Sequence, residues 1–96
     1  MREKTLECKI IKAVKAMGGI CPKFVSPGID GMPDRIVLLP GGRLAFVEVK
    51  APGCKPRPLQ DRRHELLWSL GFRVYILDDE QKIQPILSEI SEGGDA

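Results

Sequence analysis

The sequence predicts an α/β fold, in which helices cover both sides of a mixed β-sheet and the elements follow in the order α-β-β-β-α-β. Apolar residues recur at helical spacing near the start of the chain and again in its second half. Between these helices, two β-branched and aliphatic runs flank a Gly-Gly pair, a pattern typical of a β-hairpin. The second run is largely apolar on both faces. We therefore expect it to be a central strand that is covered on both sides.

The first helix is predicted over residues 3–17 and is stopped by Gly18-Gly19. Its apolar residues follow at steps of four, four and three, and they are Leu6, Ile10, Val14 and Met17. Residues 20–25 are a candidate for a short strand, in which Pro22 favours an edge position. Residues 26–33 contain two prolines and two glycines, which indicates a loop.

The predicted hairpin joins residues 36–39 to residues 44–49, and a second loop follows at residues 51–57. A second helix should begin at Pro58, which suits the first helical position, and end at Gly71. Its apolar residues are Leu59, Leu66, Leu67 and Leu70.

The last part of the chain gives a weaker pattern. Residues 72–77 are predicted to form a further strand, and residues 83–90 a weak strand or a short helix broken near Pro85. We see no repeat or linker, so residues 1–92 are expected to form a single domain, with residues 93–96 as a frayed tail.

Composition limits the class of protein. A chain of 96 residues can bury a core without disulfide bonds. The three cysteines are widely spaced and His64 is the only histidine, which argues against a structural zinc site and for free thiols in a reducing cytosol. Neither a signal peptide nor a membrane span of ~18 apolar residues is visible, so we expect a cytoplasmic protein.

Charge is distributed unevenly along the chain. Basic residues outnumber acidic ones over residues 41–64, and acidic residues dominate residues 78–96. A basic middle segment favours a polyanionic partner, although charge on a small domain is more often a solvated face.

Asp34, Glu48 and Lys50 are the charged residues that stand where apolar ones are expected. Side chains alternate along a strand, so Glu48 and Lys50 should share one face, roughly 6–7 Å apart. A two-residue Gly41-Gly42 turn would place Asp34 opposite Val49, on the wrong face. A three-residue loop centred on Gly41 would place it opposite Glu48, and a bulge, or a position of Asp34 before regular pairing begins, would also serve.

Two neighbouring carboxylates repel each other unless a cation lies between them. Mg²⁺ and Mn²⁺ prefer such hard oxygen ligands, together with waters and phosphate oxygens. Lys50 could then steer a water molecule or offset developing charge. The alternative is a half-exposed ion pair between Glu48 and Lys50, with Asp34 simply opening a turn. The apolar surroundings favour the functional interpretation, because unpaired buried charge is costly.

These residues resemble the PD-(D/E)xK nuclease signature and, more specifically, the virus-type replication–repair nuclease domain, the VRR-NUC family. The resemblance extends from about Glu7 to Asp78. It depends on four pieces in order, which read Gly31-Met32-Pro33-Asp34, Val47-Glu48-Val49-Lys50, Ala51-Pro52-Gly53 and Gln60. Cys54 departs from the family's usual acidic or polar residue, which affects loop contacts rather than the metal site.

The resemblance implies a restriction-endonuclease-like core and a Mg²⁺- or Mn²⁺-dependent endonuclease acting on DNA in a bacterial or phage-infected cell. It implies Asp34, Glu48 and the Val49 carbonyl as metal ligands, with Lys50 as the catalytic lysine. Stand-alone members are expected to be homodimers that cut branched DNA such as four-way junctions.

Further site residues follow from the same resemblance. The family's acidic residue on the first helix is best matched by Glu7, with Glu3 one turn away as the alternative. Gln60 is expected to be catalytic, although it could instead close a helix-capping box. Lys55 and Arg57 could hold backbone phosphates or could be solubilising charges. His64 and Trp68 follow Gln60 at steps of four residues, on the same side of the predicted helix. We expect Trp68 in the core and His64 at the surface or against DNA.

Other functions fit the sequence less well. With a single histidine and no Gly-Lys-Ser/Thr loop, neither a hydrolase triad nor a phosphate loop is present. A glycosidase or a Schiff-base enzyme would need a deeper cleft than so small a chain offers. The remaining alternative is a non-catalytic module that binds nucleic acid or a partner protein while keeping a nuclease-like fold.

Overall fold

The computed structural model describes residues 1–93. Its helices and strands are α1 (Glu3–Ala16), β1 (Arg35–Leu39), β2 (Arg43–Val49), α2 (Pro58–Ser69), β3 (Val74–Leu77), the short 3₁₀ helix η1 (Glu80–Lys82) and α3 (Ile83–Glu92). None of the helices in these residues is long and apolar enough to cross a membrane.

The three strands form one mixed sheet in the order β1-β2-β3, so β2 is the central strand, as the sequence predicts. β1 and β2 are antiparallel, and β2 and β3 are parallel. The β2-β3 connection passes through α2, which is the crossover that a parallel pair requires.

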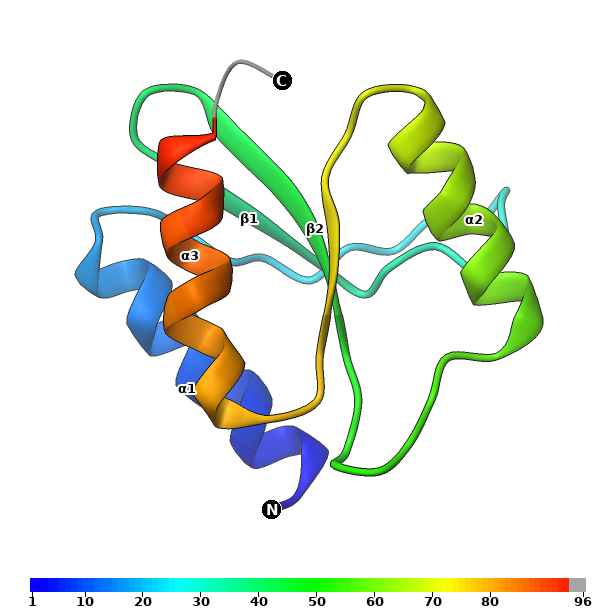
Figure 1. The fold of residues 1–96 in the computed structure, drawn as a ribbon, viewed down its shortest axis with the longest axis horizontal. Helices are drawn as coiled ribbons and strands as arrows, with labels where there is room; N and C mark the ends of the chain where they lie inside the picture. Colours follow the sequence, from blue (N-terminus) through cyan, green and yellow to red (C-terminus); the bar gives the residue numbers. More distant parts are fainter. Residues whose placement is uncertain (94–96) are drawn as a thin grey trace.

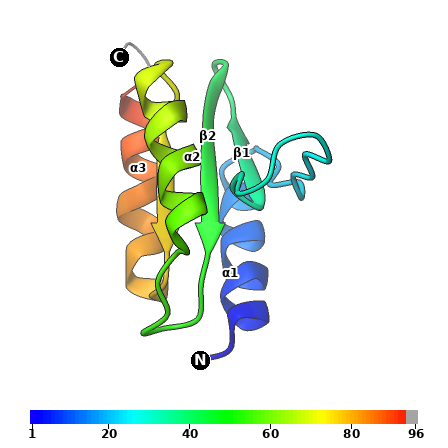
Figure 2. The same ribbon diagram turned by 90° about the vertical axis from the view of Figure 1, so that its right-hand side faces the viewer.

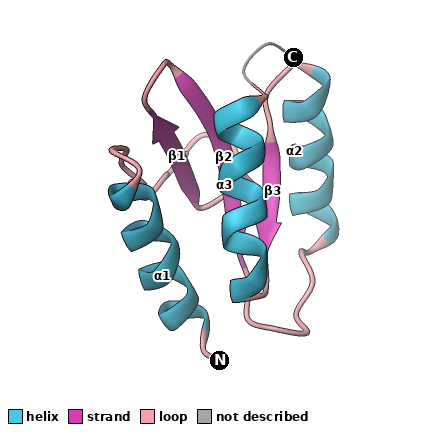
Figure 3. Cartoon of the chain, turned by 60° about the vertical axis from the view of Figure 1, so that its left-hand side comes forward, coloured by secondary structure: helices cyan, strands magenta, loops and turns pink. Residues whose placement is uncertain are grey.

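Helices cover both faces of the sheet, which confirms the predicted α/β layers (Figure 1). α1 and α3 lie together on one face, and α2 lies on the other (Figure 3). The main core is formed between α1, α3 and the strands, and its fully buried members include Leu6, Ile10, Val14, Val37, Ala45, Val47, Val49, Leu77 and Leu87. A smaller cluster beneath α2 contains Phe46, Leu67 and Val74. Because side chains alternate along β2, this strand contributes residues to both cores, as expected for a central strand.

The hairpin between β1 and β2 has a three-residue loop, which is the loop length that places Asp34 opposite Glu48. Leu39 pairs with Arg43, which leaves Pro40, Gly41 and Gly42 in the loop. Gly41 and Gly42 have φ values of 86° and 74°, which side chains rarely adopt. The register of Arg35 opposite Val47, continued by one residue, brings Asp34 opposite Glu48.

Residues 20–25 do not form the predicted strand. Ile20 and Lys23 make only isolated bridges to Leu38 and Arg35. Pro22 lacks an N–H group, and only its carbonyl pairs, accepting from the Ile36 N–H at 3.1 Å. The segment therefore follows β1 irregularly, and the loop after it projects past the sheet edge (Figure 2).

The C-terminal segment is a helix that runs through Pro85, so the predicted break there is wrong. Pro85 lies in the first turn of α3, where the backbone N–H groups have no partner within the helix and a proline is tolerated. Of the tail predicted at residues 93–96, residues 94–96 lie outside the described part of the chain.

Candidate metal-dependent nuclease site

Asp34 and Glu48 meet where β1 begins and β2 ends. Asp34 precedes β1, and its Oδ1 accepts a hydrogen bond of 3.2 Å from the Val49 N–H. Lys50 follows β2 directly and is tied to β3 by a 2.9 Å bond from its N–H to the Leu77 carbonyl. The hairpin and the parallel pairing therefore fix the backbone on which all three charged side chains stand.

Glu48 is buried, at 3% exposure, and is held from two sides. Gln60 Nε2 donates to Glu48 Oε2 at 2.9 Å, and Lys50 Nζ lies 3.4 Å from the same oxygen. The other oxygen, Oε1, is buried with no hydrogen-bond partner among residues 1–93. The ion pair with Lys50 thus exists, but it is not the half-exposed surface pair that the alternative interpretation requires.

Gln60 makes a helix-capping contact and also a contact with the acidic site. Its Oε1 accepts a 2.9 Å bond from the Arg57 N–H, which is the glutamine half of a capping box. Its Nε2 contacts Glu48. The start of α2 and the orientation of the Glu48 carboxylate are therefore set by one side chain.

The buried face of α2 is more polar than predicted. It consists of Gln60, His64 and Leu67, whereas Leu66, Leu70 and Trp68 are exposed. His64 is therefore not a surface residue, and the 48% exposure of Trp68 excludes it from the core. Gln60 sets this rotation, because turning toward Glu48 carries the residues at i+4 and i+7 inward.

The carboxyl groups of the site resist ionisation together. Burial raises the pKa of Asp34 to about 6, with a further contribution from Glu48 and smaller ones from Glu7 and Glu3. Burial also raises the pKa of Glu48, although Lys50 and Gln60 oppose the shift. Burial is thus the main reason that both carboxyl groups favour the protonated form, and a nearby cation would favour the ionised form of each.

The raised pKa of Asp34 predicts how the stability of metal-free protein depends on pH. Because the folded pKa of about 6 exceeds the ordinary 3.8, the protonated carboxyl contributes stability that is complete below pH 3.8 and is lost as pH rises through 6. In EDTA, the wild type should lose on the order of 1 kcal/mol relative to Asp34→Asn between pH 4 and pH 7.5, after allowance for solvent screening. Urea unfolding of both proteins across this range measures the difference. A difference that stays constant with pH would rule out the raised pKa.

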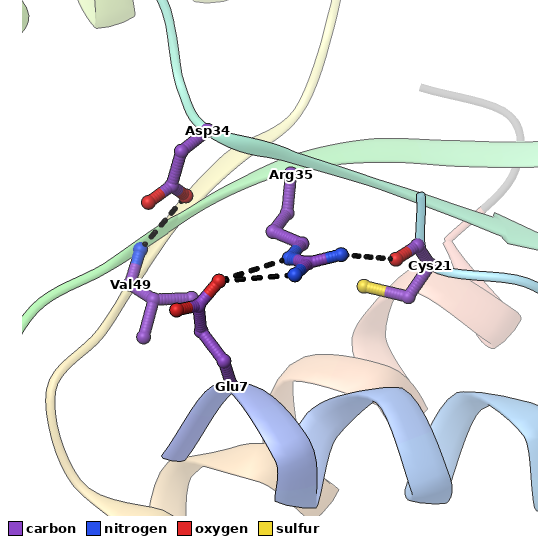
Figure 4. A network of polar contacts seen from close by, with 5 residues as sticks. All are labelled: Glu7, Cys21, Asp34, Arg35 and Val49. Carbon is purple, nitrogen blue, oxygen red and sulfur yellow. Dashed lines mark hydrogen bonds and ion pairs between the residues drawn. The ribbon is translucent and has the colours of Figure 1, made fainter. Parts of the chain in front are cut away.

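Glu7 and Glu3 reach the edge of the site from α1. Both add to the repulsion on Asp34, so each lies within electrostatic range of it. Glu7 is held by an arginine that the sequence analysis missed: Arg35 Nη2 lies 3.0 Å from Glu7 Oε2 (Figure 4). A charged residue at the first position of an otherwise apolar strand was the available signal. The Glu3 side chain makes no hydrogen bond or ion pair within residues 1–93.

Lys55 and Arg57 are both exposed on the loop that joins β2 to α2. This loop begins next to Lys50, so both charges lie on the chain segment that leaves the acidic site. Neither side chain has a hydrogen bond or ion pair within residues 1–93, which leaves both available to a ligand.

The loop before Asp34 is fixed against α2 at Gly31. Its φ is 85°, and a Cβ atom there would lie 2.9 Å from Leu59 Cγ and 3.1 Å from Arg63 Cγ. Gly31→Ala should therefore lower the free energy of unfolding by about 2 kcal/mol or more. Gly28→Ala is the matched control, because nothing lies within 4 Å of its Cβ position. Urea unfolding compares the two, and equal losses would contradict the packing argument.

The donor atoms fit a magnesium or manganese ion better than a zinc ion. Within residues 1–93, no group of three or more His, Cys, Asp or Glu side chains is placed to hold a metal. Mg²⁺ does not need such a group, because it keeps several waters and is bound through one or two carboxylates. The buried Glu48 Oε1, which lacks a partner, supplies an oxygen of the required kind.

Two comparisons bear on this arrangement. The chain is 47% identical over 91 residues to "Putative nuclease p44" of Acyrthosiphon pisum secondary endosymbiont phage 1, which covers 95% of this chain and 97% of that protein. A solved structure of a VRR_NUC domain matches with a TM-score of 0.83 and 31% sequence identity, over 90% of this chain and 94% of that one. No family model matches the sequence. The likeness covers nearly the full length in both cases, and the chain therefore belongs to the VRR-NUC family of PD-(D/E)xK nucleases.

Proposed function

We propose that this nuclease cleaves phosphodiester bonds within DNA and depends on a Mg²⁺ or Mn²⁺ ion held by Asp34, Glu48 and the Val49 carbonyl. The observation that carries the proposal is Glu48 Oε1, a buried oxygen without a partner in the described chain. An unsatisfied buried acceptor costs about 1–3 kcal/mol, and a bound cation would remove that cost. It would also favour the ionised form of Asp34, whose pKa is raised by burial and, to a smaller extent, by the Glu48 charge.

The bound ion would neutralise phosphate charge and make a water molecule easier to deprotonate. The chain's own side chains orient the reactants around it. Lys50, whose Nζ lies 3.4 Å from Glu48 Oε2, can donate to the attacking water or to a phosphate oxygen. Gln60 keeps the Glu48 carboxylate in one orientation, as the hydrogen-bond partners of metal ligands generally do.

We further propose that the substrate is branched DNA, such as a four-way junction, and that the active species is a homodimer in the cytoplasm of the host cell. The exposed Lys55 and Arg57 would contact backbone phosphates without reading sequence. One site per chain implies one cut per subunit, so a two-fold symmetric pair would cut two strands of a junction.

Cleavage of labelled four-way junction, flap, fork and duplex DNA in Mg²⁺ or Mn²⁺ tests the proposal, together with the molar mass in solution. We expect paired cuts in the junction by a species of dimer mass. Equal cleavage of all four substrates would contradict the proposed preference for branched DNA, and a monomer mass would contradict the proposed dimer. Neither result would contradict the proposed metal-dependent cleavage. DNA binding without cleavage would instead favour a non-catalytic module.

A further inference from the structure

Arg35 makes three hydrogen bonds that link α1, β1 and the segment before β1. Its Nε and Nη2 donate to Glu7 Oε2 at 3.2 and 3.0 Å, and its Nη1 donates to the Cys21 carbonyl at 2.9 Å. The side chains of Arg35 and Glu7 are only 14% and 22% exposed. Figure 4 shows the guanidinium between the Glu7 carboxylate and Cys21, in the view that also contains Asp34. The carbonyl contact fixes the guanidinium, so Arg35 presents a fixed pair of donors to Glu7.

Both donors go to the same Glu7 oxygen. A carboxylate that only anchors a helix commonly engages arginine through both oxygens, in a fork-to-fork arrangement. Here Glu7 Oε1 has no hydrogen bond within residues 1–93, and Glu7 lies within electrostatic range of Asp34. The pair therefore leaves one oxygen unused near the acidic site.

Within the described residues, Glu7 is not part of a three-residue metal-binding group with Asp34 and Glu48. No group of three acidic, histidine or cysteine side chains is close enough to hold a metal within the described chain. Glu7 in this position therefore fits a contact through a water molecule better than a direct contact with the cation.

We propose that Arg35 is a positioning residue, which holds Glu7 Oε2 so that Glu7 Oε1 can accept a hydrogen bond from a water molecule in the acidic site. The inference rests on the proposed function. Lysine cannot replace arginine in this role, because a single ammonium cannot bridge Glu7 and the Cys21 carbonyl with a planar fork.

The test compares Arg35→Lys with Lys9→Met. Lys9 also links α1 to another element, through an exposed 2.6 Å ion pair with Glu80, and it does not touch Glu7. Loss of a hydrogen-bonding residue outside the direct ligands of a metal site typically costs about 10–100-fold in metal affinity or activity. Arg35→Lys should lower kcat by about that factor with KM for DNA unchanged, and should raise the Mn²⁺ concentration for half-maximal thermal stabilisation about 10-fold. Lys9→Met should change neither quantity.

A second pair of variants separates positioning from folding. In the Glu7→Gln background, Arg35→Lys should lower kcat by less than about 3-fold, because the carboxylate that Arg35 orients is already gone. Equal effects of Arg35→Lys in both backgrounds would overturn the inference, as would a lower melting temperature with unchanged kcat and Mn²⁺ dependence. Full activity of Asp34→Asn would contradict the proposed function itself. That outcome can be distinguished from failure of the Arg35 inference, which leaves the effect of Asp34→Asn unchanged.

Discussion

Asp34→Asn is expected to lower DNA cleavage by about 10³-fold while making the metal-free protein more stable at neutral pH. Asparagine can still accept the hydrogen bond from the Val49 N–H, so the backbone around the site should be kept. The substitution removes a charge that a cation needs and that the cation-free protein pays to bury. Cleavage assays in Mn²⁺ and urea unfolding in EDTA at pH 7.5 measure the two effects.

The opposite signs of these effects distinguish a functional acid from a structural one. Asp30→Asn is the matched control, because Asp30 lies in the same loop, is exposed, and is used only through its carbonyl, which accepts from Arg63. We expect Asp30→Asn to change neither activity nor stability appreciably. Asp34→Asn that lowers activity and stability together would mean that Asp34 serves the fold.

Lys50→Met is expected to lower kcat by about 10²–10³-fold while leaving stabilisation by Mn²⁺ intact. In the proposed site, Lys50 would supply a positive charge beside the reacting groups but no oxygen ligand, so catalysis should fail while cation binding survives. Its loss also removes a group that lowers the pKa of Glu48, so Glu48 should become harder to ionise without metal. Single-turnover cleavage and thermal unfolding in Mn²⁺ measure the two properties.

Lys55→Met provides the comparison for Lys50→Met. Lys55 is exposed in the loop after β2 and is proposed to contact phosphate, so its loss should raise KM with little change in kcat. If Lys50→Met behaves like Lys55→Met, with the effect confined to KM, Lys50 contributes to DNA binding rather than to the chemical step.

The sequence limited the ways in which the acidic pair could be aligned. Strand parity allows Asp34 to face Glu48 with a three-residue loop, with a bulge, or where Asp34 precedes regular pairing, and the loop contains three residues. The apolar faces of residues 44–49 similarly identified the central strand. Both inferences succeed because strand alternation is a strict geometric rule.

The sequence failed where tertiary contacts outweigh hydrophobic periodicity. The leucines of α2 suggested one buried face, but the hydrogen bond from Gln60 to Glu48 turns the helix so that His64 is buried. The charge of Arg35 at the start of β1 was a local signal, but its partner Glu7 lies 28 residues away in the sequence, so no local pattern could identify the pair. Pro85 appeared to break a helix because its effect depends on where the helix begins.

Calorimetric titration of Mn²⁺ into the metal-free protein at pH 7.5 tests most directly whether Asp34 and Glu48 form a cation site. We expect one ion per chain for the wild type and loss of binding in Asp34→Asn. At a free Mn²⁺ concentration of 100 times the dissociation constant, binding should raise the free energy of unfolding by about 2.7 kcal/mol. Absence of binding by the wild type, or equal binding by Asp34→Asn, would contradict the account.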